Sequence, residues 1–231
     1  MTTHYQDLVR PSDTEDRSVV GLRTIRSLRR SLYSRLFKRL LDVSLIVIAM
    51  PLVVPVILVL ALLVMLDGGS PFYTQERVGQ GGRIYRIWKL RSMVHEAEAA
   101  LERYLATSPA ARAEWNLTQK LRNDPRVTRV GRFLRAYSLD ELPQLWNVLK
   151  GDMSLVGPRP MMPNQRILYP GSAYYDLRPG ITGYWQVTQR NRSSFADRAW
   201  YDTQYHRDVS FTTDLVLLFS TVRVVLKATG H

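Results

Sequence analysis

Residues 43–66 form an uncharged apolar run, VSLIVIAMPLVVPVILVLALLVML, and no other feature of this 231-residue chain restricts its fold as much. An apolar run longer than about 18 residues is a candidate membrane helix. It is not a typical signal peptide, because it starts far from the N-terminus, its apolar core is too long and no small-residue cleavage site follows it. We therefore expect residues 23–67 to be a basic approach followed by a membrane helix.

Pro51 and Pro55 lie near the middle of the run. Each proline lacks a backbone donor and its ring presses on the preceding turn, so the carbonyls of Val47 and Pro51 lose their helical partners. The sequence therefore predicts a kink or a break at these prolines.

Basic residues flank the run on both sides. The upstream cluster contains Arg23, Arg26, Arg29, Arg30, Arg35, Lys38 and Arg39, and the downstream cluster contains Arg77, Arg83, Arg86, Lys89 and Arg91. Positive charge marks the cytoplasmic side of a membrane, so a helix that bends and returns to the same face accounts for both clusters. A proline-kinked single span is the alternative, since membrane helices tolerate proline. These residues alone leave both arrangements open.

The balance of charge predicts an anionic partner. Lysine and arginine total 32 against 20 acidic residues, a formal net charge of +12. Nucleic acid, a phospholipid surface and a phosphorylated substrate are the partner classes for such a chain. The absence of cysteine excludes disulfides and thiolate metal sites, and the four scattered histidines show no metal-ligand spacing.

The remaining segments predict a helix-dominated α+β fold. Residues 1–22 are polar and typical of a disordered tail, and residues 68–231 are expected to form an interfacial catalytic domain. In that domain, 68–93 predicts two strands around the turn GQGG. Two helical segments suit either a core or a membrane interface. The first is 94–122, which is interrupted at TSPA and has Leu101, Tyr104, Leu105 and Trp115 on one side. The second is 214–227, which is too short to span a membrane and has Thr213 as its expected N-cap.

Asp140 and Glu141 are adjacent in SLDELPQLWNVLKGDMSLVGPRP, residues 138–160. A purely structural interpretation accounts for them. Ser138 is a good N-cap and Glu141 lies three residues on, which makes a capping box. Acids in a first turn also complement the helix dipole, and leucines at helical spacing supply a buried face.

The surroundings of the pair favour chemistry. Arg132 and Arg135 precede it, and Arg159 follows in a segment rich in Gly and Pro, which is typical of a shaped loop. Arginine again stands near Pro, Gly and aromatic residues in LRPGITGYWQ (177–186) and QRNR (189–192). Arginines bind phosphate bidentately, and of two adjacent carboxylates one can attack phosphorus while the other holds a divalent cation. We therefore expect phosphoryl transfer, with a helix N-terminus keeping the attacking carboxylate ionised.

From about Phe37 to its C-terminus the chain resembles the bacterial sugar transferases, the monotopic polyprenyl-phosphate phosphoglycosyl transferases. The resemblance rests on an ordered set of motifs: KRLLDV, GGSPFYTQERVGQGG, KLRSM, DPRVTRVGRFLR, SLDELPQLWNVLKGDMSLVGPRP, RPGITGYWQV and QRNR. A lone capping box would be weak evidence, but this set in this order is specific. The chain is most similar to the short members that initiate exopolysaccharide synthesis, several of which are similar to galactosyl-phosphate transferases.

The resemblance implies a two-step reaction, the first membrane step of exopolysaccharide biosynthesis. A UDP-sugar, with galactose favoured, binds with Mg²⁺ at the cytoplasmic face, and Asp140 attacks the phosphorus next to the sugar. UMP leaves and a covalent phosphosugar-enzyme remains. Undecaprenyl phosphate then takes the phosphosugar, which gives an undecaprenyl-diphosphate-sugar.

The resemblance also implies roles for individual residues. Asp140 is the nucleophile, and Asp140 and Glu141 are the metal residues, with Glu141 helping to bind Mg²⁺. Arg135 and Arg159 are expected to hold the phosphates. The residues of the motifs near the nucleotide are Arg178, Gln189 and Arg190.

The family has a re-entrant membrane helix that is broken at a proline, and Pro51 matches that position, with Pro55 as a second break. The protein would then be monotopic, at the cytoplasmic face of the bacterial inner membrane, held by interfacial amphipathic helices and anionic lipids. Family members often have serine before this proline, whereas this chain has Met50, and Ser44 is too far upstream to substitute. The departure concerns the bend and not the chemistry.

Three other functions fit parts of the sequence. A membrane-tethered nucleic-acid-binding protein fits the charge, but no recognition helix or nucleic-acid motif is present, so we expect no nucleic-acid partner. A non-catalytic membrane scaffold for polysaccharide assembly would not need Asp140. A glycosyl transferase would release UDP in place of UMP. Homo-oligomers are compatible with a sequence that shows no interface signature, and the sequence does not identify the sugar.

Overall fold

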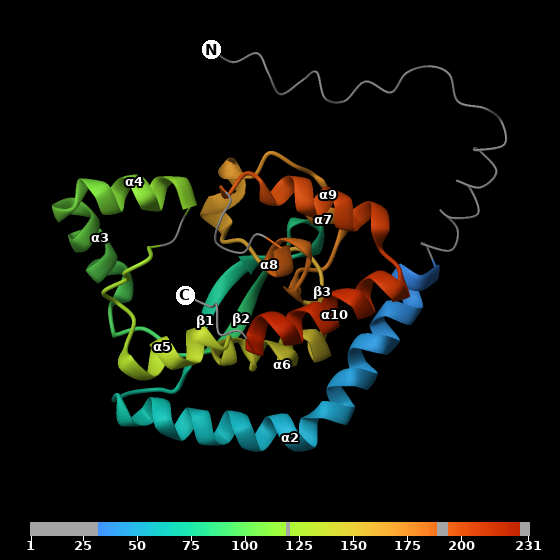
Figure 1. The fold of residues 1–231 in the computed structure, drawn as a ribbon, viewed down its shortest axis with the longest axis horizontal. Helices are drawn as coiled ribbons and strands as arrows, with labels where there is room; N and C mark the ends of the chain where they lie inside the picture. Colours follow the sequence, from blue (N-terminus) through green and yellow to red (C-terminus); the bar gives the residue numbers. More distant parts are fainter. Residues whose placement is uncertain (1–31, 119–120, 189–193, 227–231) are drawn as a thin grey trace, which may run out of the picture.

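The computed structural model describes residues 32–118, 121–188 and 194–226 (Figure 1). The strands are β1 (Phe72–Val78), β2 (Ile84–Leu90), β3 (Ser154–Val156) and β4 (Gly180–Thr182). The α-helices are α2 (Lys38–Leu66), α3 (Ala97–Thr107), α4 (Pro109–Thr118), α5 (Arg129–Ala136), α6 (Gln144–Lys150), α7 (Ala173–Asp176), α8 (Tyr184–Thr188), α9 (Arg198–Asp208) and α10 (Phe211–Leu226). Shorter helical turns are η1 (Tyr33–Phe37), η2 (Gln80–Gly82), η3 (Leu139–Glu141) and η4 (Pro163–Leu168).

Helices dominate the described chain, and the expected α+β class with a small hairpin is confirmed. β1 and β2 pair antiparallel, with Phe72 opposite Leu90. The turn between them needs its glycines, because Gly81 and Gly82 have φ values of 66° and 77°, which side chains disfavour. The predictions for residues 1–22 and for Gln189 and Arg190 lie outside the described residues.

α2 bends near its middle, and Pro51 and Pro55 lie inside it (Figure 1). The helix continues through both prolines, so the predicted kink is confirmed and takes the form of a bend, not a break. Apolar side chains before and after the first proline are exposed, Ile48 by 76% and Leu52 by 74%. Within the described chain α2 is the one helix long and apolar enough to cross a membrane.

Both arms of α2 pack against the same body of protein. Ile46 in the first arm packs on β2 and α6, and Leu60, Ala61 and Val64 in the second arm pack on β2 and α5. A straight helix of 29 residues would separate its ends by about 44 Å. The bend is what brings both ends of α2 to one domain.

A buried polar cluster fixes the first arm to α10. Its centre is Asp214, whose carboxylate accepts from Lys38 Nζ at 2.6 Å and from the hydroxyls of Tyr33 and Tyr205 at 2.7 Å each. Nearby, the Ser154 hydroxyl donates to the Asp42 carboxylate at 2.7 Å. Removing one partner of a buried ion pair costs about 3–5 kcal/mol, so loss of either Lys38 or Asp214 should loosen the contact between α2 and α10.

The expected capping box at Ser138 is wrong. Ser138 has a left-handed backbone (φ 56°) and its side chain makes no capping hydrogen bond. In a helix that began at Ser138, Pro143 would fall beyond the first turn, where its missing N–H leaves the Leu139 carbonyl unpaired. The chain instead forms the short turn η3 and begins α6 after Pro143, where proline is tolerated.

Of the two other helical predictions, one is confirmed and one shifts. The interruption at TSPA falls at Ser108, between α3 and α4, and the expected apolar side chains form a small cluster of their own. α10 begins at Phe211, earlier than expected, and Thr213 lies in its first turn. The Ser210 hydroxyl accepts from the Thr213 N–H at 3.2 Å, so Ser210 and not Thr213 caps this helix.

Glycines bring the two loops around the site together. β3 pairs parallel with β4, with Ser154 opposite Gly180. The backbones of Gly157 and Gly180 then approach so closely that a Cβ on either would collide with the other segment. Arg159, two residues after Gly157, is thereby held beside the segment that leads into α8.

Candidate active site

Asp140 lies in η3 and its residue is only 6% exposed. The Nζ of Lys89, on β2, is 3.6 Å from its Oδ2 atom. Burial raises the pKa of the Asp140 carboxyl, Lys89 opposes the rise, and the neighbouring Glu141 adds to it. Asp140 lies in the short turn η3 and nearby cations favour its charged form, so the expected role of a helix N-terminus stays a prediction.

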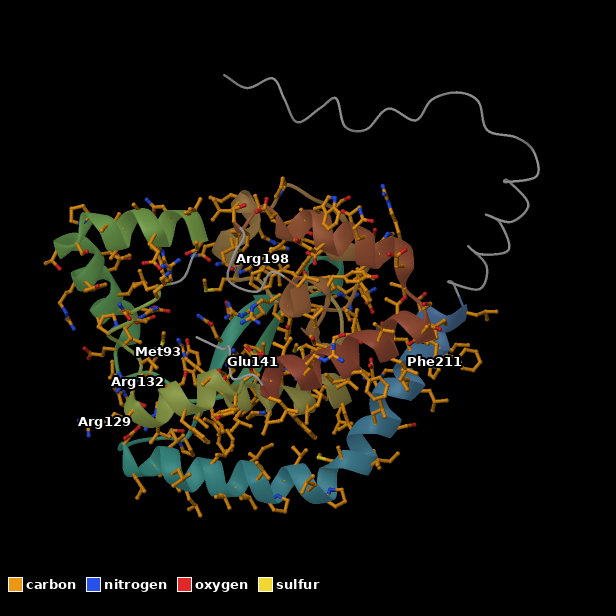
Figure 2. All side chains as sticks on the ribbon, viewed as in Figure 1. Met93, Arg129, Arg132, Glu141, Arg198 and Phe211 are labelled. Carbon is orange, nitrogen blue, oxygen red and sulfur yellow. The ribbon has the colours of Figure 1, made fainter. Side chains whose placement is uncertain are left out.

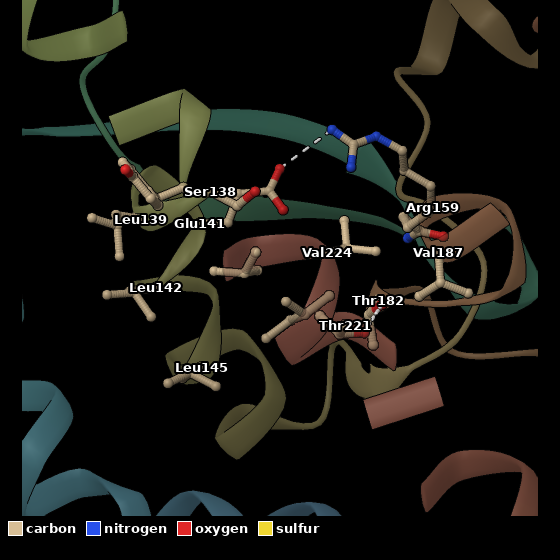
Figure 3. A pocket seen from close by; sticks show the side chains of 14 residues that line it. Ser138, Leu139, Glu141, Leu142, Leu145, Arg159, Thr182, Val187, Thr221 and Val224 are labelled. Carbon is tan, nitrogen blue, oxygen red and sulfur yellow. Dashed lines mark hydrogen bonds and ion pairs between the residues drawn. The ribbon is translucent and has the colours of Figure 1, made fainter. Parts of the chain in front are cut away.

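Glu141 is the hub of the ion pairs at the site. Its Oε1 accepts from Lys89 Nζ at 2.8 Å and from Arg159 Nη2 at 3.3 Å, the contact drawn in Figure 3. Lys89 therefore reaches both carboxylates. Sequence reasoning counted Lys89 only as a flanking charge, although it stands in the KLRSM motif that carried the family resemblance.

The expected phosphate-binding arginines are placed differently from one another. Arg159 contacts Glu141 directly, whereas Arg135, in the last turn of α5, donates from Nε to the Ser92 hydroxyl at 2.9 Å. Burial lowers the pKa of Arg135, and the charge of Asp140 raises it again, which places the two groups within electrostatic reach. Arg132 is exposed and lies away from Glu141 in Figure 2.

The expected nucleotide-binding residues are not brought to the carboxylates in the described chain. Arg178 is half-buried between α7 and β4, and no interaction among the described residues joins it to Asp140 or Glu141. Gln189 and Arg190 lie outside the described residues, so their predicted role stays a prediction.

A groove of about 230 Å³ runs from Glu141 along α6 and α10 (Figure 3). Its polar end holds Glu141, Arg159 and Gln186. Its walls are apolar and are formed mainly by Leu139, Leu142, Leu145, Ile181, Val187, Val224 and Val225. The groove suits a ligand with a charged head and an apolar chain.

The carboxylate pair suits a magnesium ion that is also bound by substrate phosphates. Mg²⁺ usually keeps several waters and is bound by one or two carboxylates together with substrate phosphates. Asp140 and Glu141 supply that number of carboxylates, and the described chain contains no group of three or more acidic, His or Cys side chains that would make a closed site. Two carboxylates suit a Mg²⁺ ion that substrate phosphates also bind, and this role stays a prediction.

A buried Asp140 beside the half-buried Glu141, among cations and at one end of an apolar groove, fits the predicted phosphoryl transfer to an acceptor with an apolar chain. Residues 33–228 match the family model described as bacterial sugar transferase, so the chain belongs to that family. The predicted family and the predicted class of enzyme, a transferase, are confirmed.

Several curated relatives share the matched region. The chain is 49% identical over 175 residues to a UDP-galactose-lipid carrier transferase of Erwinia amylovora, covering 75% of this chain and 37% of the relative. It is 45% identical to the exopolysaccharide production protein ExoY of Rhizobium meliloti, covering 75% and 77%. It is 47% identical to an undecaprenyl-phosphate galactose phosphotransferase of Salmonella typhimurium, covering 72% and 36%. The matched region thus spans little more than a third of two of these relatives.

Proposed function

We propose that this protein transfers a sugar-1-phosphate from a UDP-sugar, with galactose favoured, to undecaprenyl phosphate and releases UMP. The observation that carries the proposal is a buried, reactive Asp140 beside Glu141, ringed by Lys89 and Arg159, at the head of an apolar groove. The names of the relatives, which include a galactose-lipid carrier transferase and a galactose phosphotransferase, support this substrate class. The step would begin exopolysaccharide synthesis, as the name of ExoY suggests.

In the first half-reaction an Oδ atom of Asp140 forms a bond to the sugar-bearing phosphorus. The bond from that phosphorus to the bridging oxygen breaks, and its electron pair leaves on the oxygen of UMP. Asp140 must be ionised to attack. Lys89, 3.6 Å away, and the nearby arginines partly offset the burial that raises the pKa of Asp140.

Glu141, together with Asp140, would hold Mg²⁺ when the donor is bound. The ion supplies positive charge that screens the phosphates from the incoming carboxylate. Glu141 also orients Lys89 and Arg159, since one of its oxygens accepts from both cations. Those cations are then placed where negative charge gathers during the transfer.

In the second half-reaction the phosphate of undecaprenyl phosphate attacks the phosphorus of the phosphosugar. The bond from phosphorus to Asp140 breaks and its electron pair returns to the carboxylate, which regenerates the enzyme. The apolar walls of the groove lie beside Glu141 and Arg159. They suit the first isoprene units of the acceptor, whose charged head must reach Asp140.

α2 would enter the cytoplasmic leaflet of the inner membrane and return. Its two arms pack on one domain and only 17% of its most apolar stretch is buried by protein. A leaflet would cover the exposed side chains at the bend, and anionic lipids would attract the basic surface. Cysteines introduced at Leu32 and Ser70 should both react with a reagent added from the cytoplasm, and labelling of either from the periplasm would refute re-entry.

Identifying the released nucleotide tests the proposed reaction. Protein in nanodiscs would be incubated with Mg²⁺, undecaprenyl phosphate and a panel of UDP-sugars. UMP from one donor supports phosphosugar transfer and names the sugar. UDP would replace the mechanism with glycosyl transfer, and no product from any donor would favour a non-catalytic scaffold for polysaccharide assembly.

A further inference from the structure

A second cationic group lies beyond the carboxylates, centred on Arg198 at the start of α9. Arg198 is only 7% exposed. Its guanidinium carbon is 4.3 Å from the centre of the Trp185 ring and 4.4 Å from that of Phe195. Stacking engages the faces of a guanidinium and leaves its in-plane N–H donors available. Among the described residues the Nε of Arg198 has no hydrogen-bond partner.

Two other side chains are unsatisfied in the same way: Gln186 in α8, which packs on α9, and Arg77 in β1, whose charge acts on Arg198. Both polar atoms of Gln186, which is 7% exposed, lack a hydrogen-bond partner within the described chain, and so does the Nε of Arg77. Buried polar groups in native proteins are almost always hydrogen-bonded, and each exception requires an explanation. A ligand that binds all of these polar groups would explain why none of them has a partner within the protein.

This group adjoins the carboxylates. The Arg159 guanidinium carbon is 5.9 Å from the centre of the same Trp185 ring that Arg198 stacks on, and Arg159 contacts Glu141. Gln186 lines the same groove as Glu141 and Arg159. In Figure 2, Arg198 and Glu141 are both labelled in the central part of the domain.

Protein charges balance the group only in part, since Asp202 is the one carboxylate of the described chain that acts on Arg198 and burial raises the pKa of that carboxyl to about 7. Burial, then the positive charge of Arg159, lowers the pKa of Arg198 to about 9, and the same two causes lower the pKa of Arg77. No carboxylate forms an ion pair with Arg77 or Arg198 among the described residues. The acid on the same helix, Asp202, accepts from the Tyr169 hydroxyl at 2.8 Å. Buried arginines that repel one another call for an anion.

We infer that Arg198, Arg77 and Gln186 form a second phosphate subsite, which binds the nucleoside-bearing phosphate of the donor. The inference rests on the proposed function and deepens it. A diphosphate donor has two phosphates, and Arg159 stands between the carboxylates and Arg198. With the sugar-bearing phosphorus at Asp140, the second phosphate falls toward Arg198. In-plane N–H groups there would bind its oxygens, including the one that gains an electron pair when UMP leaves.

Direct binding of UMP tests this subsite without turnover. UMP and uridine would be titrated calorimetrically into nanodisc-held wild type and Arg198→Gln. We expect UMP affinity to fall roughly 10- to 100-fold, as for a lost charge-assisted hydrogen bond, and the weak binding of uridine to stay the same. Arg112→Gln, which removes one exposed positive charge elsewhere, is the matched control and should bind UMP as wild type does.

Gln186→Met guards against a folding defect, because it replaces unsatisfied polar atoms with an apolar side chain of similar size. It should weaken UMP binding while leaving the melting temperature unchanged or higher. Unchanged UMP affinity in both Arg198→Gln and Gln186→Met would overturn the subsite, even if wild type releases UMP. UMP binding that depends on Arg198 in a protein that turns over no UDP-sugar would keep the subsite and overturn the proposed function.

Discussion

Two buried carboxylates in this protein have similar surroundings and opposite behaviour. The Asp214 carboxylate accepts hydrogen bonds from the Lys38 ammonium and from two tyrosine hydroxyls, all within 2.7 Å. Asp140 has a lysine 3.6 Å away, and among the described residues its carboxylate accepts no hydrogen bond. The first carboxylate is fully engaged and can only hold structure together. The second is buried and under-coordinated, so its oxygens remain able to react.

Asp140→Asn should cause the largest loss of activity. The amide keeps the shape of the side chain and removes the nucleophile, so turnover should fall by about 10⁴-fold or more. The sugar-phosphate adduct should vanish from the intact-protein mass spectrum. Because Asp140 adds no well-formed ion pair to the fold, the melting temperature should not fall. Normal turnover by this variant would remove Asp140 as the nucleophile.

Asp214→Asn should have the reverse effect. It leaves the buried Lys38 ammonium without its partner, and loss of one member of a buried pair costs about 3–5 kcal/mol. We expect a large fall in melting temperature, with near-normal activity per folded molecule at low temperature. Lys150→Gln, which breaks an exposed ion pair with Asp152, should change stability by less than about 1 kcal/mol. Equal effects of the two substitutions would refute the structural role of the Asp214 cluster.

Lys89→Met tests what controls the ionisation of Asp140, because it removes the main charge that opposes the raised pKa of this carboxyl. Since only the ionised carboxylate attacks, activity is lost as the pH falls through that pKa. The substitution should move the acidic limb of the pH–rate profile for UMP release to higher pH. At neutral pH the rate should fall about 100-fold, as for loss of one electrostatic stabiliser. An unmoved acidic limb would show that Lys89 does not control Asp140.

Asp202 gives the smallest expected effect. Burial raises the pKa of Asp202 from 3.8 to about 7. The folded state therefore holds this proton more tightly than the unfolded chain, so the contribution to stability is full below pH 3.8 and is lost as the pH rises through about 7. Asp202→Asn should flatten the decline of the melting temperature between about pH 4 and pH 7 by a few degrees. A decline identical to that of wild type would assign it to other groups.

The sequence predicts the parts of the fold that have a local signal. The apolar run with two prolines predicts the bent α2, and GQGG predicts the hairpin, because these features act within a few residues. α6 begins after Pro143 and not at Ser138, because a proline beyond the first turn prevents the helix that the capping pattern predicts. β3 and β4 have three residues each, too few for an alternating pattern to be seen.

The site was only partly predictable for a similar reason. Asp140, Glu141 and Arg159 lie in one motif, so their proximity could be expected. Lys89 lies on β2, 52 residues before Glu141 in the chain, and only the tertiary fold brings it to the carboxylates. Arg198 joins through a shared tryptophan ring. The raised pKa of Asp140 depends on burial, which no local pattern records.

The bend of α2 has a consequence for how the protein reaches its membrane. In the proposed re-entrant arrangement, both arms of α2 return to one domain and the described residues include no hydrophilic segment on the far side of the membrane. Insertion then moves no charged side chain through the transmembrane voltage, which otherwise does about 2.3 kcal/mol of work per elementary charge for each 100 mV. The described chain would occupy area in one leaflet only, so its insertion would expand that leaflet relative to the other and favour membranes curved toward the cytoplasm.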